Sequence, residues 1–298
     1  MQKYDYSFFN RLITKFKTLW TDLFYAPISI NACLFYSYGR LIHRNWGDDI
    51  NDFFIRQLFR RKISYLYNSS LSMRRNSINY LMIGSTIDQL CNSQTIIWGA
   101  GVIDGNSELP AKPLKVLAVR GPLTRQYLLN KGVDVPPVYG DPALLLKYWY
   151  KPTVGKKYKL GIIPHFDDFD HPALVGLKNN PEILIIKMEG YRDWLEVLEQ
   201  VCSCAYIASS SLHGLIMSEA YDIPNLWIEL SGKLMGGHFK FHDFFLSINQ
   251  DRPQPFVVRE GMGVDEIMNT LSSYKKGSID LNPLINAAPF RMYLTREH

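Results

Sequence analysis

Residues 205–230 read AYIASSSLHGLIMSEAYDIPNLWIEL, and they place two short apolar runs on either side of a longer segment. The runs at 205–208 and 224–230 have the length and composition of buried strands. Between them, three serines supply turn and cap positions, and residues 212–221 fit a helix that begins near Leu212. A strand, a helix and a second strand in succession are typical of parallel strands joined by a crossover helix. This unit predicts an α/β fold.

The same alternation recurs along the rest of the chain. Strands that end in glycine-containing loops are expected at 78–86 and 94–102, and a strand at 114–122 leads into a helix that stops at Gly132. The remaining expected elements are strands at 29–39, 160–166 and 182–188, a helix at 191–204 and a helix that begins near Phe53 after a loop at 44–52.

A polar, basic segment at 147–159, which contains Pro152 and Gly155, has the composition of a linker. The strand and helix pattern restarts after it. We therefore predict an N-terminal α/β domain at 1–150 and a C-terminal α/β domain with a tail at 151–298, both Rossmann-like, which face each other across a cleft.

The composition is that of a globular protein, with 47% hydrophobic and 20% charged residues among 298. No apolar run approaches the ~20 residues of a membrane-spanning helix. The N-terminus lacks a signal-peptide pattern, and the four cysteines form neither a disulfide framework nor a zinc spacing. These features predict a cytoplasmic protein with reduced thiols.

The formal charge of +5 is unevenly distributed. Residues 53–87 contain six Lys or Arg and no Asp or Glu, which indicates either a solvated basic face or a surface for phosphates or anionic lipids. The first 25 residues mix aromatics, leucines and lysines at helical spacing. Such a helix either packs on its own domain or lies in the plane of a membrane surface, so peripheral contact with the inner face of a membrane stays open.

Ligands of open α/β sheets bind outside the carboxyl ends of the strands, so the loops there are where site residues are expected. In the loop at 44–52, Asn45 and Gly47 fit a turn, and Asp49 is close to the expected start of a helix, where it could cap it. The exposed backbone and carboxylates of this loop would also suit hydrogen bonds to sugar hydroxyls. Glycines in the loop at 98–101 permit close approach of a ligand to the backbone. The candidates from these two loops are Asn45, Gly47, Asp48, Asp49, Gly99 and Gly101.

Arg120 follows the apolar strand, where its guanidinium either clamps a carboxylate or phosphate or pairs with a neighbouring Asp. His165 ends another strand and is followed by Asp167 and Asp168, a cluster in which we expect no metal. Nothing in the basic block resembles a nucleic-acid reader motif.

The serines at 209–211 precede a helix whose free N–H groups form an anion site. His213 lies in the first turn of that helix. Its imidazole is either a core group or, beside a bound anion, a proton carrier near neutral pH. Ser209, Ser210 and Ser211 are accordingly candidate substrate contacts, and His213 is a candidate catalytic residue.

These motifs together resemble the polysaccharide pyruvyl transferase family. The resemblance spans about Asn45 to Phe245, and its motifs occur in the order NWGDDI, WGAGV, VRGPLTRQYL, YGDPALLL, LGIIPHFDD, SSSLHGLIMSEAYDIP and KFHDFF. Members are similar to two-domain glycosyltransferases of the GT-B type. They transfer the enolpyruvyl unit of phosphoenolpyruvate to a sugar diol, which gives a pyruvate ketal and phosphate without a metal or a nucleotide.

The resemblance implies that His213 and Arg120 take part in donor binding and catalysis, with the acceptor on the N-terminal side and the donor on the C-terminal side. The family often has Arg-Leu-His at the cleft helix, whereas this chain has Ser211, Leu212 and His213. Another cation must then bind the donor, and Lys240, Arg125 and the basic block are the candidates, with Lys240 preferred.

The resemblance thus implies a pyruvyltransferase of capsule, exopolysaccharide or cell-wall glycan synthesis. A lipid-linked oligosaccharide acceptor would suit the basic and aromatic N-terminal third. Two alternatives stay open, namely a GT-B-type glycosyltransferase that uses a nucleotide sugar and a non-catalytic saccharide-binding relative.

Overall fold

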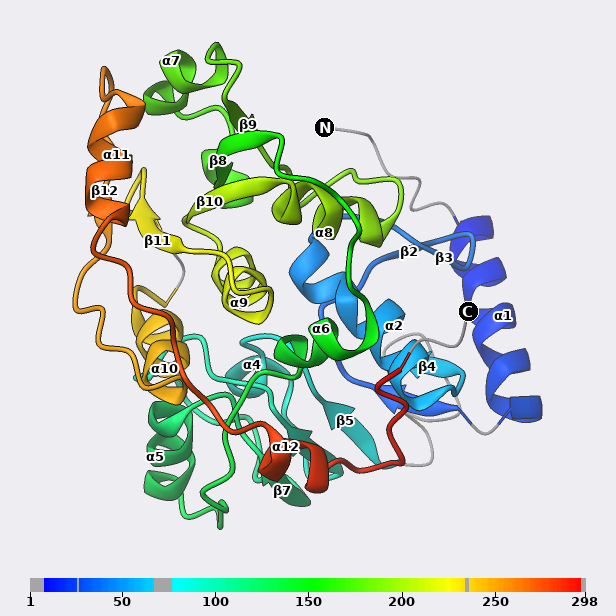
Figure 1. The fold of residues 1–298 in the computed structure, drawn as a ribbon. Coiled ribbons are helices and arrows are strands. Elements are labelled where there is room, and N and C mark those ends of the chain that lie inside the picture. Colours follow the sequence, from blue (N-terminus) through cyan, green and yellow to red (C-terminus); the bar gives the residue numbers. More distant parts are fainter. Residues whose placement is uncertain (1–7, 26, 67–76, 234–235, 296–298) are drawn as a thin grey trace.

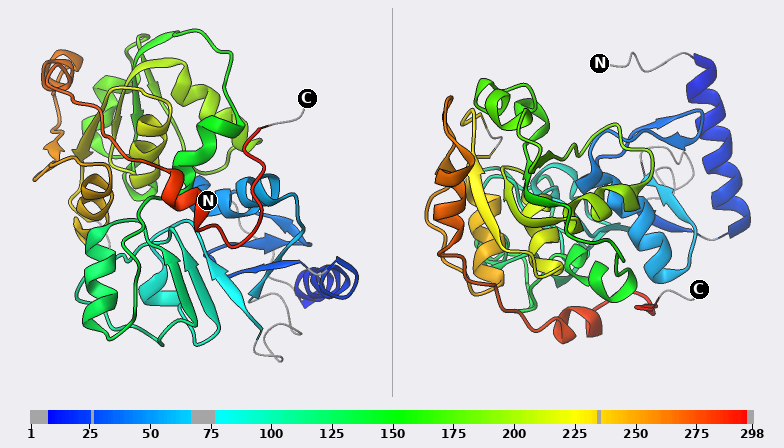
Figure 2. Two further views of the ribbon diagram at one scale, coloured as in Figure 1. Left: turned by 60° about the horizontal axis from the view of Figure 1, so that its bottom comes forward. Right: turned by 45° about the horizontal axis from the view of Figure 1, so that its top comes forward.

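The computed structural model describes residues 8–25, 27–66, 77–233 and 236–295. The first seven residues of the expected N-terminal helix, and Arg74 and Arg75 of the basic block, lie outside the described residues. The structure contains two five-stranded parallel sheets, which the left view of Figure 2 shows one above the other. The predicted α/β fold is therefore confirmed.

The first sheet is built from the N-terminal half of the chain. Its strands, in spatial order, are β4 (Ile63–Tyr65), β1 (Ile28–Ile30), β5 (Asn79–Leu81), β6 (Thr95–Trp98) and β7 (Lys115–Ala118). The helices of this half are α1 (Phe8–Tyr25), α2 (Trp46–Phe59), α4 (Ile87–Leu90) and α5 (Pro122–Asn130). A small antiparallel hairpin, β2 (Tyr36–Ser37) and β3 (Arg40–Leu41), lies beside α1 (Figure 1).

The second sheet is built from the C-terminal half. Its strands, in spatial order, are β12 (Phe256–Val257), β11 (Asn225–Glu229), β10 (Cys204–Ser209), β8 (Tyr158–Ile163) and β9 (Ile183–Ile185). The helices are α6 (Leu146–Trp149), α7 (Val175–Lys178), α8 (Trp194–Cys202), α9 (Leu212–Ala220), α10 (Phe239–Ser247), α11 (Val264–Leu271) and α12 (Asn282–Asn286). Short 3-10 helices cover Pro142–Leu145, Phe166–Asp168 and Pro172–Leu174.

The register of the second sheet brings the ends of three strands level. Ser209 of β10 pairs with Ile163 of β8 on one side and with Trp227 of β11 on the other. Because all three strands are parallel, the residues that follow them emerge at one edge of the sheet. The loop after β8 and the start of α9 are therefore neighbours.

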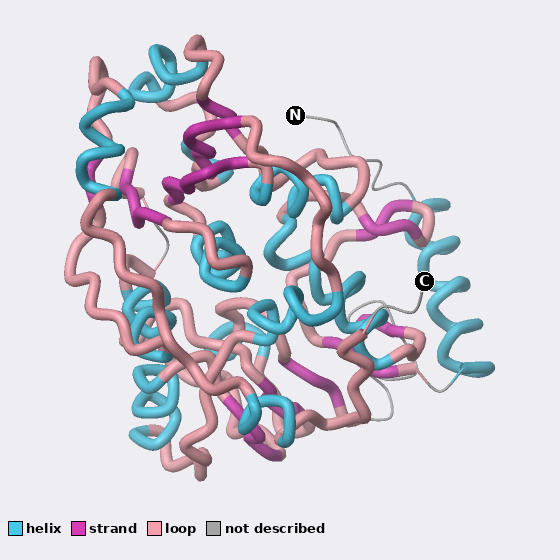
Figure 3. Tube along the Cα trace, viewed as in Figure 1, coloured by secondary structure: helices cyan, strands magenta, loops and turns pink. Residues whose placement is uncertain are grey.

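The segment that joins the two halves is mostly loop, as Figure 3 shows, and it contains the expected linker at 147–159. The sheets come from residues 28–118 and 158–257, on either side of the boundary predicted at residue 150. The division into two Rossmann-like domains, and the similarity to GT-B enzymes, stay predictions.

Two C-terminal elements return to the first half of the molecule. The chain end runs from the upper half in Figure 1 down to α12, where the carbonyl of Leu284 accepts a hydrogen bond of 2.9 Å from Trp98 Nε1. Phe290 packs against the rings of Phe59 and Tyr80. Helix α10 packs against α5. A core cluster that includes residues of both sheets joins the halves.

Two expectations are wrong. The strand expected at 29–39 is limited to β1, which ends at Ile30, and the chain then enters the separate hairpin β2–β3. Helix α2 begins at Trp46 rather than near Phe53, so most of the expected loop at 44–52 is helical. Asn45 is the N-cap, and its Oδ1 accepts a hydrogen bond of 3.1 Å from the N–H of Gly47. Asp49 lies inside the helix and does not cap it.

Candidate functional site

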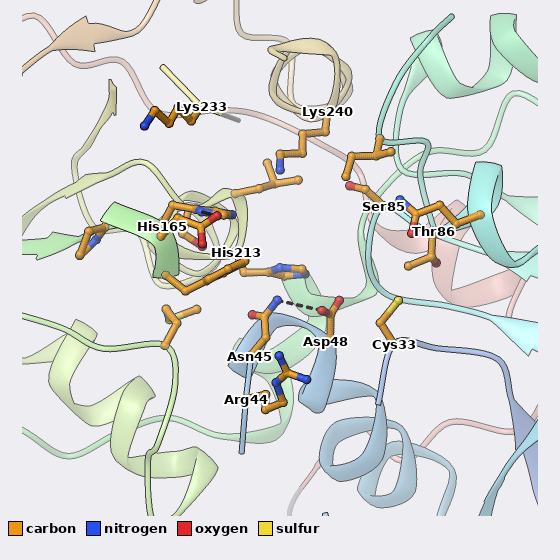
Figure 4. Close-up of a pocket in the computed structure, with 18 residues that line it drawn as sticks. Cys33, Arg44, Asn45, Asp48, Ser85, Thr86, His165, His213, Lys233 and Lys240 are labelled. Carbon is orange, nitrogen blue, oxygen red and sulfur yellow. Dashed lines mark hydrogen bonds and ion pairs between the residues drawn. The ribbon is translucent and has the colours of Figure 1, made fainter. Parts of the chain in front are cut away.

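A cavity of about 450 Å³ lies between the two halves, at the carboxyl ends of strands from both sheets. Its walls come from the starts of α2 and α9, the loops after β1, β5 and β8, and one side chain of α10. Figure 4 shows Lys240 pointing into this space from α10, opposite Asn45 and Asp48, with the ring of His213 between them.

Asn45 and Asp48 form the wall that belongs to α2. Asn45 Nδ2 donates a hydrogen bond of 2.8 Å to Asp48 Oδ2, and this bond holds the carboxylate at the start of the helix. Burial raises the pKa of Asp48 to about 6, although Asn45 and the charge of Lys240 act in the opposite direction. Asp48 can therefore exist with or without its proton near neutral pH.

His213 lies in the first turn of α9, where its ring packs on the backbone of α2. A Cβ atom at Gly47 would lie only 2.1 Å from His213 Nδ1, so glycine is required beneath the imidazole. The Nε2 atom is buried and has no hydrogen-bond partner among the described residues. Burial, with the charges of Arg120 and Lys240, lowers the pKa of His213 to about 3. The imidazole is therefore neutral near pH 7.

Lys240 is the most buried lysine or arginine among the described residues that line the cavity. Its side chain is 9% exposed, and burial lowers its pKa to about 8, helped by Arg120 and opposed by Asp48. The ammonium is thus still mostly protonated at pH 7. Arg125, the other single residue considered as a substitute cation, does not line the cavity and donates a hydrogen bond of 3.0 Å to the carbonyl of Val135.

The three serines divide into one cavity residue and two that shape the loop. Ser211 lines the cavity and is the N-cap of α9, but its side chain makes no cap hydrogen bond. Ser209 Oγ accepts a hydrogen bond of 3.0 Å from the N–H of Ser211, and Ser210 Oγ accepts one of 2.8 Å from the N–H of His165. Ser209 and Ser210 are buried and do not line the cavity.

His165 lines the cavity, as expected for a residue after β8. Its Nδ1 lies 3.5 Å from Asp167 Oδ2. Burial and the charge of Lys240 lower the pKa of the imidazole, and the two neighbouring aspartates act in the opposite direction. His165 is therefore a hydrogen-bonding wall residue that carries little positive charge near neutral pH.

Arg120 is not where a donor clamp was predicted. Its side chain is fully buried and does not line the cavity. Nε donates a hydrogen bond of 3.0 Å to Asp243 Oδ2 of α10, while the terminal nitrogens donate to Ser85 Oγ and to the carbonyl of Val102. The alternative considered from the sequence, a salt bridge to an aspartate, is the one present. Arg120 therefore acts on the cavity through Ser85 and through its charge.

Three further candidates lie outside the cavity because they pack against other parts of the protein. A Cβ atom at Gly101 would lie 2.2 Å from Arg120 Cζ, so this glycine admits the arginine rather than a ligand. Gly99, with a φ of +88°, packs against Pro142. Asp49 is buried and accepts a hydrogen bond of 2.7 Å from the hydroxyl of Tyr191, which ties α2 to the second half.

Sequence reasoning missed several residues of the cavity wall. Ser85 and Thr86 follow β5 after Gly84, and Thr86 Oγ1 is buried without a hydrogen-bond partner among the described residues. Polar residues directly after a strand were the signal that could have identified them.

Cys33 also lines the cavity, and burial, with the charge of Asp48, raises the pKa of its thiol to about 11. Arg44 and Lys233 are exposed residues of the same wall.

The buried Arg120–Asp243 pair generates the first prediction. Asp243 accepts three hydrogen bonds, one from Arg120 and two from Thr124, so Asp243→Ala leaves a buried guanidinium without its counter-charge. We expect a loss of about 3–5 kcal/mol in the free energy of unfolding, measured by urea denaturation. Glu196→Ala, which breaks the exposed pair with Arg192, is the matched control and should cost about 0–1 kcal/mol. Equal small losses in both variants would contradict the structural role of the buried pair.

Comparison with known proteins places this chain in a family. A sequence model described as polysaccharide pyruvyl transferase matches residues 30–232, which is more than half of the chain. An uncharacterized protein of Acanthamoeba polyphaga mimivirus is 28% identical over 219 residues, which cover 70% of this chain and 73% of that protein. The matched range includes Asp48 and His213 and ends before Lys240. The chain belongs to the polysaccharide pyruvyl transferase family.

Proposed function

We propose that the protein transfers the enolpyruvyl group of phosphoenolpyruvate to two hydroxyls of one sugar residue, which forms a cyclic pyruvate ketal and releases phosphate. The observation that carries this proposal is that Asp48, His213 and Lys240 line one cavity at the N-terminus of α9 in a member of this family. The three side chains supply a protonatable carboxyl, a neutral imidazole and a cation.

The donor needs positive potential, because phosphoenolpyruvate carries both a phosphate and a carboxylate. Lys240 supplies a buried charge, and the free N–H groups at the start of α9 add the positive end of the helix dipole. Ser211 lines the same space, and Thr86 belongs to the adjoining wall. This set replaces the arginine that the family often has at position 211. Arg44 and Lys233 extend the positive potential along the wall.

The reaction needs groups that accept and return protons. A sugar hydroxyl adds to the central carbon of the enolpyruvyl group as the methylene carbon takes up a proton. The second hydroxyl then adds as the C–O bond to phosphate breaks. Of the two hydroxyl protons released, one is balanced by the proton on the new methyl group and one leaves with phosphate. Once the negative charge of the bound donor offsets the nearby cations and raises the pKa of His213, its neutral imidazole accepts a hydroxyl proton, and the protonated fraction of Asp48 supplies one.

The proposal also covers the biological setting. A lipid-linked oligosaccharide is the acceptor we favour, in capsule, exopolysaccharide or cell-wall glycan synthesis on the cytoplasmic side of a membrane. The first half of the molecule would bind the acceptor and the second half the donor, as in GT-B enzymes. No helix in the described part of the chain is long and apolar enough to cross a membrane.

The direct test is release of phosphate from phosphoenolpyruvate in the presence of aryl glycosides and lipid-linked sugars. We expect phosphate release that depends on a particular sugar, and a product whose mass equals that of the sugar plus a pyruvate ketal. Transfer from a nucleotide sugar, with none from phosphoenolpyruvate, would identify a glycosyltransferase instead. Saccharide binding without turnover of either donor would identify a binding protein.

Lys240→Ala tests the proposed donor cation. Loss of one charge-assisted hydrogen bond costs roughly 1.5–3 kcal/mol, so the KM for phosphoenolpyruvate should rise by about ten- to a hundred-fold. Arg125→Ala is the control, because Arg125 lies outside the cavity wall, and it should leave this KM unchanged. The reverse pattern, with an effect only at Arg125, would show that the wrong cation has been assigned.

His213→Gln tests the proposed proton carrier. Glutamine keeps hydrogen-bonding capacity without a group that titrates, so kcat should fall by about 10²–10⁴-fold while the melting temperature changes little. The measurements are kcat, phosphoenolpyruvate affinity and thermal unfolding of the variant and the wild type. Normal turnover with a much lower melting temperature would make His213 a structural residue.

A further inference from the structure

Helix α1 presents its apolar face away from the protein. Large hydrophobic side chains recur every three or four residues along it, and most are more than half exposed, for example Phe8 (74%), Phe16 (64%), Trp20 (52%) and Phe24 (63%). Both views of Figure 2 show the helix at the outer edge of the molecule. An apolar stripe of this length, left open to solvent, indicates a surface that another phase or molecule covers.

The opposite face of α1, which is polar, is the one that contacts the protein. Asn10 and Thr14 are the buried residues of the helix. Asn10 Nδ2 donates a hydrogen bond of 2.9 Å to Ser37 Oγ, and Thr14 Oγ1 accepts one of 2.9 Å from the N–H of Gly39. This orientation is the reverse of an ordinary surface helix, whose apolar side faces the core. The hairpin β2–β3 thus holds α1 by its polar side and turns its hydrophobic side outward.

Exposed cations border the apolar face on both sides. At 100° per residue, Arg11 and Lys15 lie along one edge of the stripe and Lys17 along the other, and all three are exposed. The half-buried Asp22 lies on the same edge as Arg11 and Lys15, so the helix carries three cations and one carboxylate. Apolar residues between rows of Lys and Arg are typical of helices that lie in the plane of a membrane surface.

The basic surface continues beyond the helix. Lys17 lines a small cavity of about 160 Å³ together with Arg56 and Lys62. The latter two also line a neighbouring groove of about 640 Å³, to which Arg60 and Arg61 contribute. Arg56 and Lys62 of the basic block therefore lie beside Lys17 of α1, and Arg60 and Arg61 continue the basic surface away from the helix. Arg56 is paired with Asp52.

We propose that α1 lies in the interface of an anionic phospholipid surface, with its apolar face among the acyl chains and the adjoining basic groove against lipid phosphates. Charge complementarity favours this occupant over a second copy of the chain. Two copies facing each other through α1 would bring the exposed Lys15 and Lys17 of one copy close to those of the other near the middle of the helix. The inference does not depend on the reaction, and residues 8–25 lie outside the range that matches the family.

The test is sedimentation of the full chain with vesicles of phosphatidylcholine alone and with vesicles that contain about 30 mol% phosphatidylglycerol. We expect binding to the anionic vesicles only, weakened at least about tenfold when the salt concentration rises from about 0.1 M to about 0.5 M.

The triple variant Phe16→Ser, Trp20→Ser, Phe24→Ser should lose at least about tenfold in affinity for the same vesicles. Lys15→Glu with Lys17→Glu should weaken the binding to anionic vesicles.

Matched controls keep the number and kind of changes but move them elsewhere. Leu114→Ser, Val175→Ser and Val257→Ser remove three exposed apolar side chains outside α1, and Lys157→Glu with Lys159→Glu reverses two exposed charges of the second half. Both controls should bind vesicles as the wild type does. Indifference of the wild type to both vesicle types would overturn the proposal. So would a dimer in analytical ultracentrifugation that the α1 triple variant abolishes, without vesicle binding by the wild type.

Discussion

The contact between His213 and Gly47 is the constraint on which the site depends. The imidazole comes from the start of α9 in the second half, and the glycine from the first turn of α2 in the first half. There is no room for a Cβ atom between them. Because the ring lies directly on the backbone of α2, the two halves meet at one defined distance, and Asp48 is held next to the start of α9. Asp49 and Tyr191 reinforce the same junction with a buried hydrogen bond.

A second consequence of the fold is that positive charge lies under and around a neutral histidine. Arg120 is buried behind the cavity wall and paired with Asp243, whereas Lys240 enters the cavity from the same helix as Asp243. Helix α10 therefore has two roles, because its Asp243 pairs with Arg120 and its Lys240 supplies the cation that lines the cavity. A site of this kind has a net attraction for anions, and a bound anion offsets the cations that keep the imidazole from taking up a proton. Both properties suit a reaction that consumes a multiply charged phosphate ester.

The sequence was sufficient where local pattern determines structure. The strand, serine turn and helix at 204–220 were predicted because apolar runs of strand length and cap residues are local signals, and β10 and α9 lie where they were expected. The placement of His165, Ser211 and His213 at one edge followed from parallel pairing. The start of α2 was missed because Asn45, and not Asp49, provides the cap, a choice that depends on hydrogen bonds to Gly47 and Asp48.

Long-range packing decides what the sequence could not show. The end of a strand suggested that Arg120 emerges at the sheet edge, but Asp243, 123 residues later, draws the guanidinium inward. Lys240 was the preferred of three candidate cations for the arginine that is absent at Ser211, and the packing of α10 against α5 and α9 brings it to the cavity. The pattern of α1 indicated an amphipathic helix, yet which face contacts the protein depends on Ser37 and Gly39 of the hairpin.

The central claim is that an anionic donor binds beside His213, and the protonation state of this imidazole tests it most directly. Without a ligand, His213 should be neutral at pH 7, because burial and nearby cations lower its pKa to about 3. Bound phosphoenolpyruvate adds negative charge beside the ring and should raise this pKa. Nitrogen-15 spectra of histidine-labelled protein, recorded from about pH 5 to pH 8 and assigned with His213→Gln, measure the effect. The account predicts that His213 stays neutral over this range without ligand or with a nucleotide sugar, and takes up a proton within it when phosphoenolpyruvate is bound; an imidazole that stays neutral throughout at saturating phosphoenolpyruvate would contradict it.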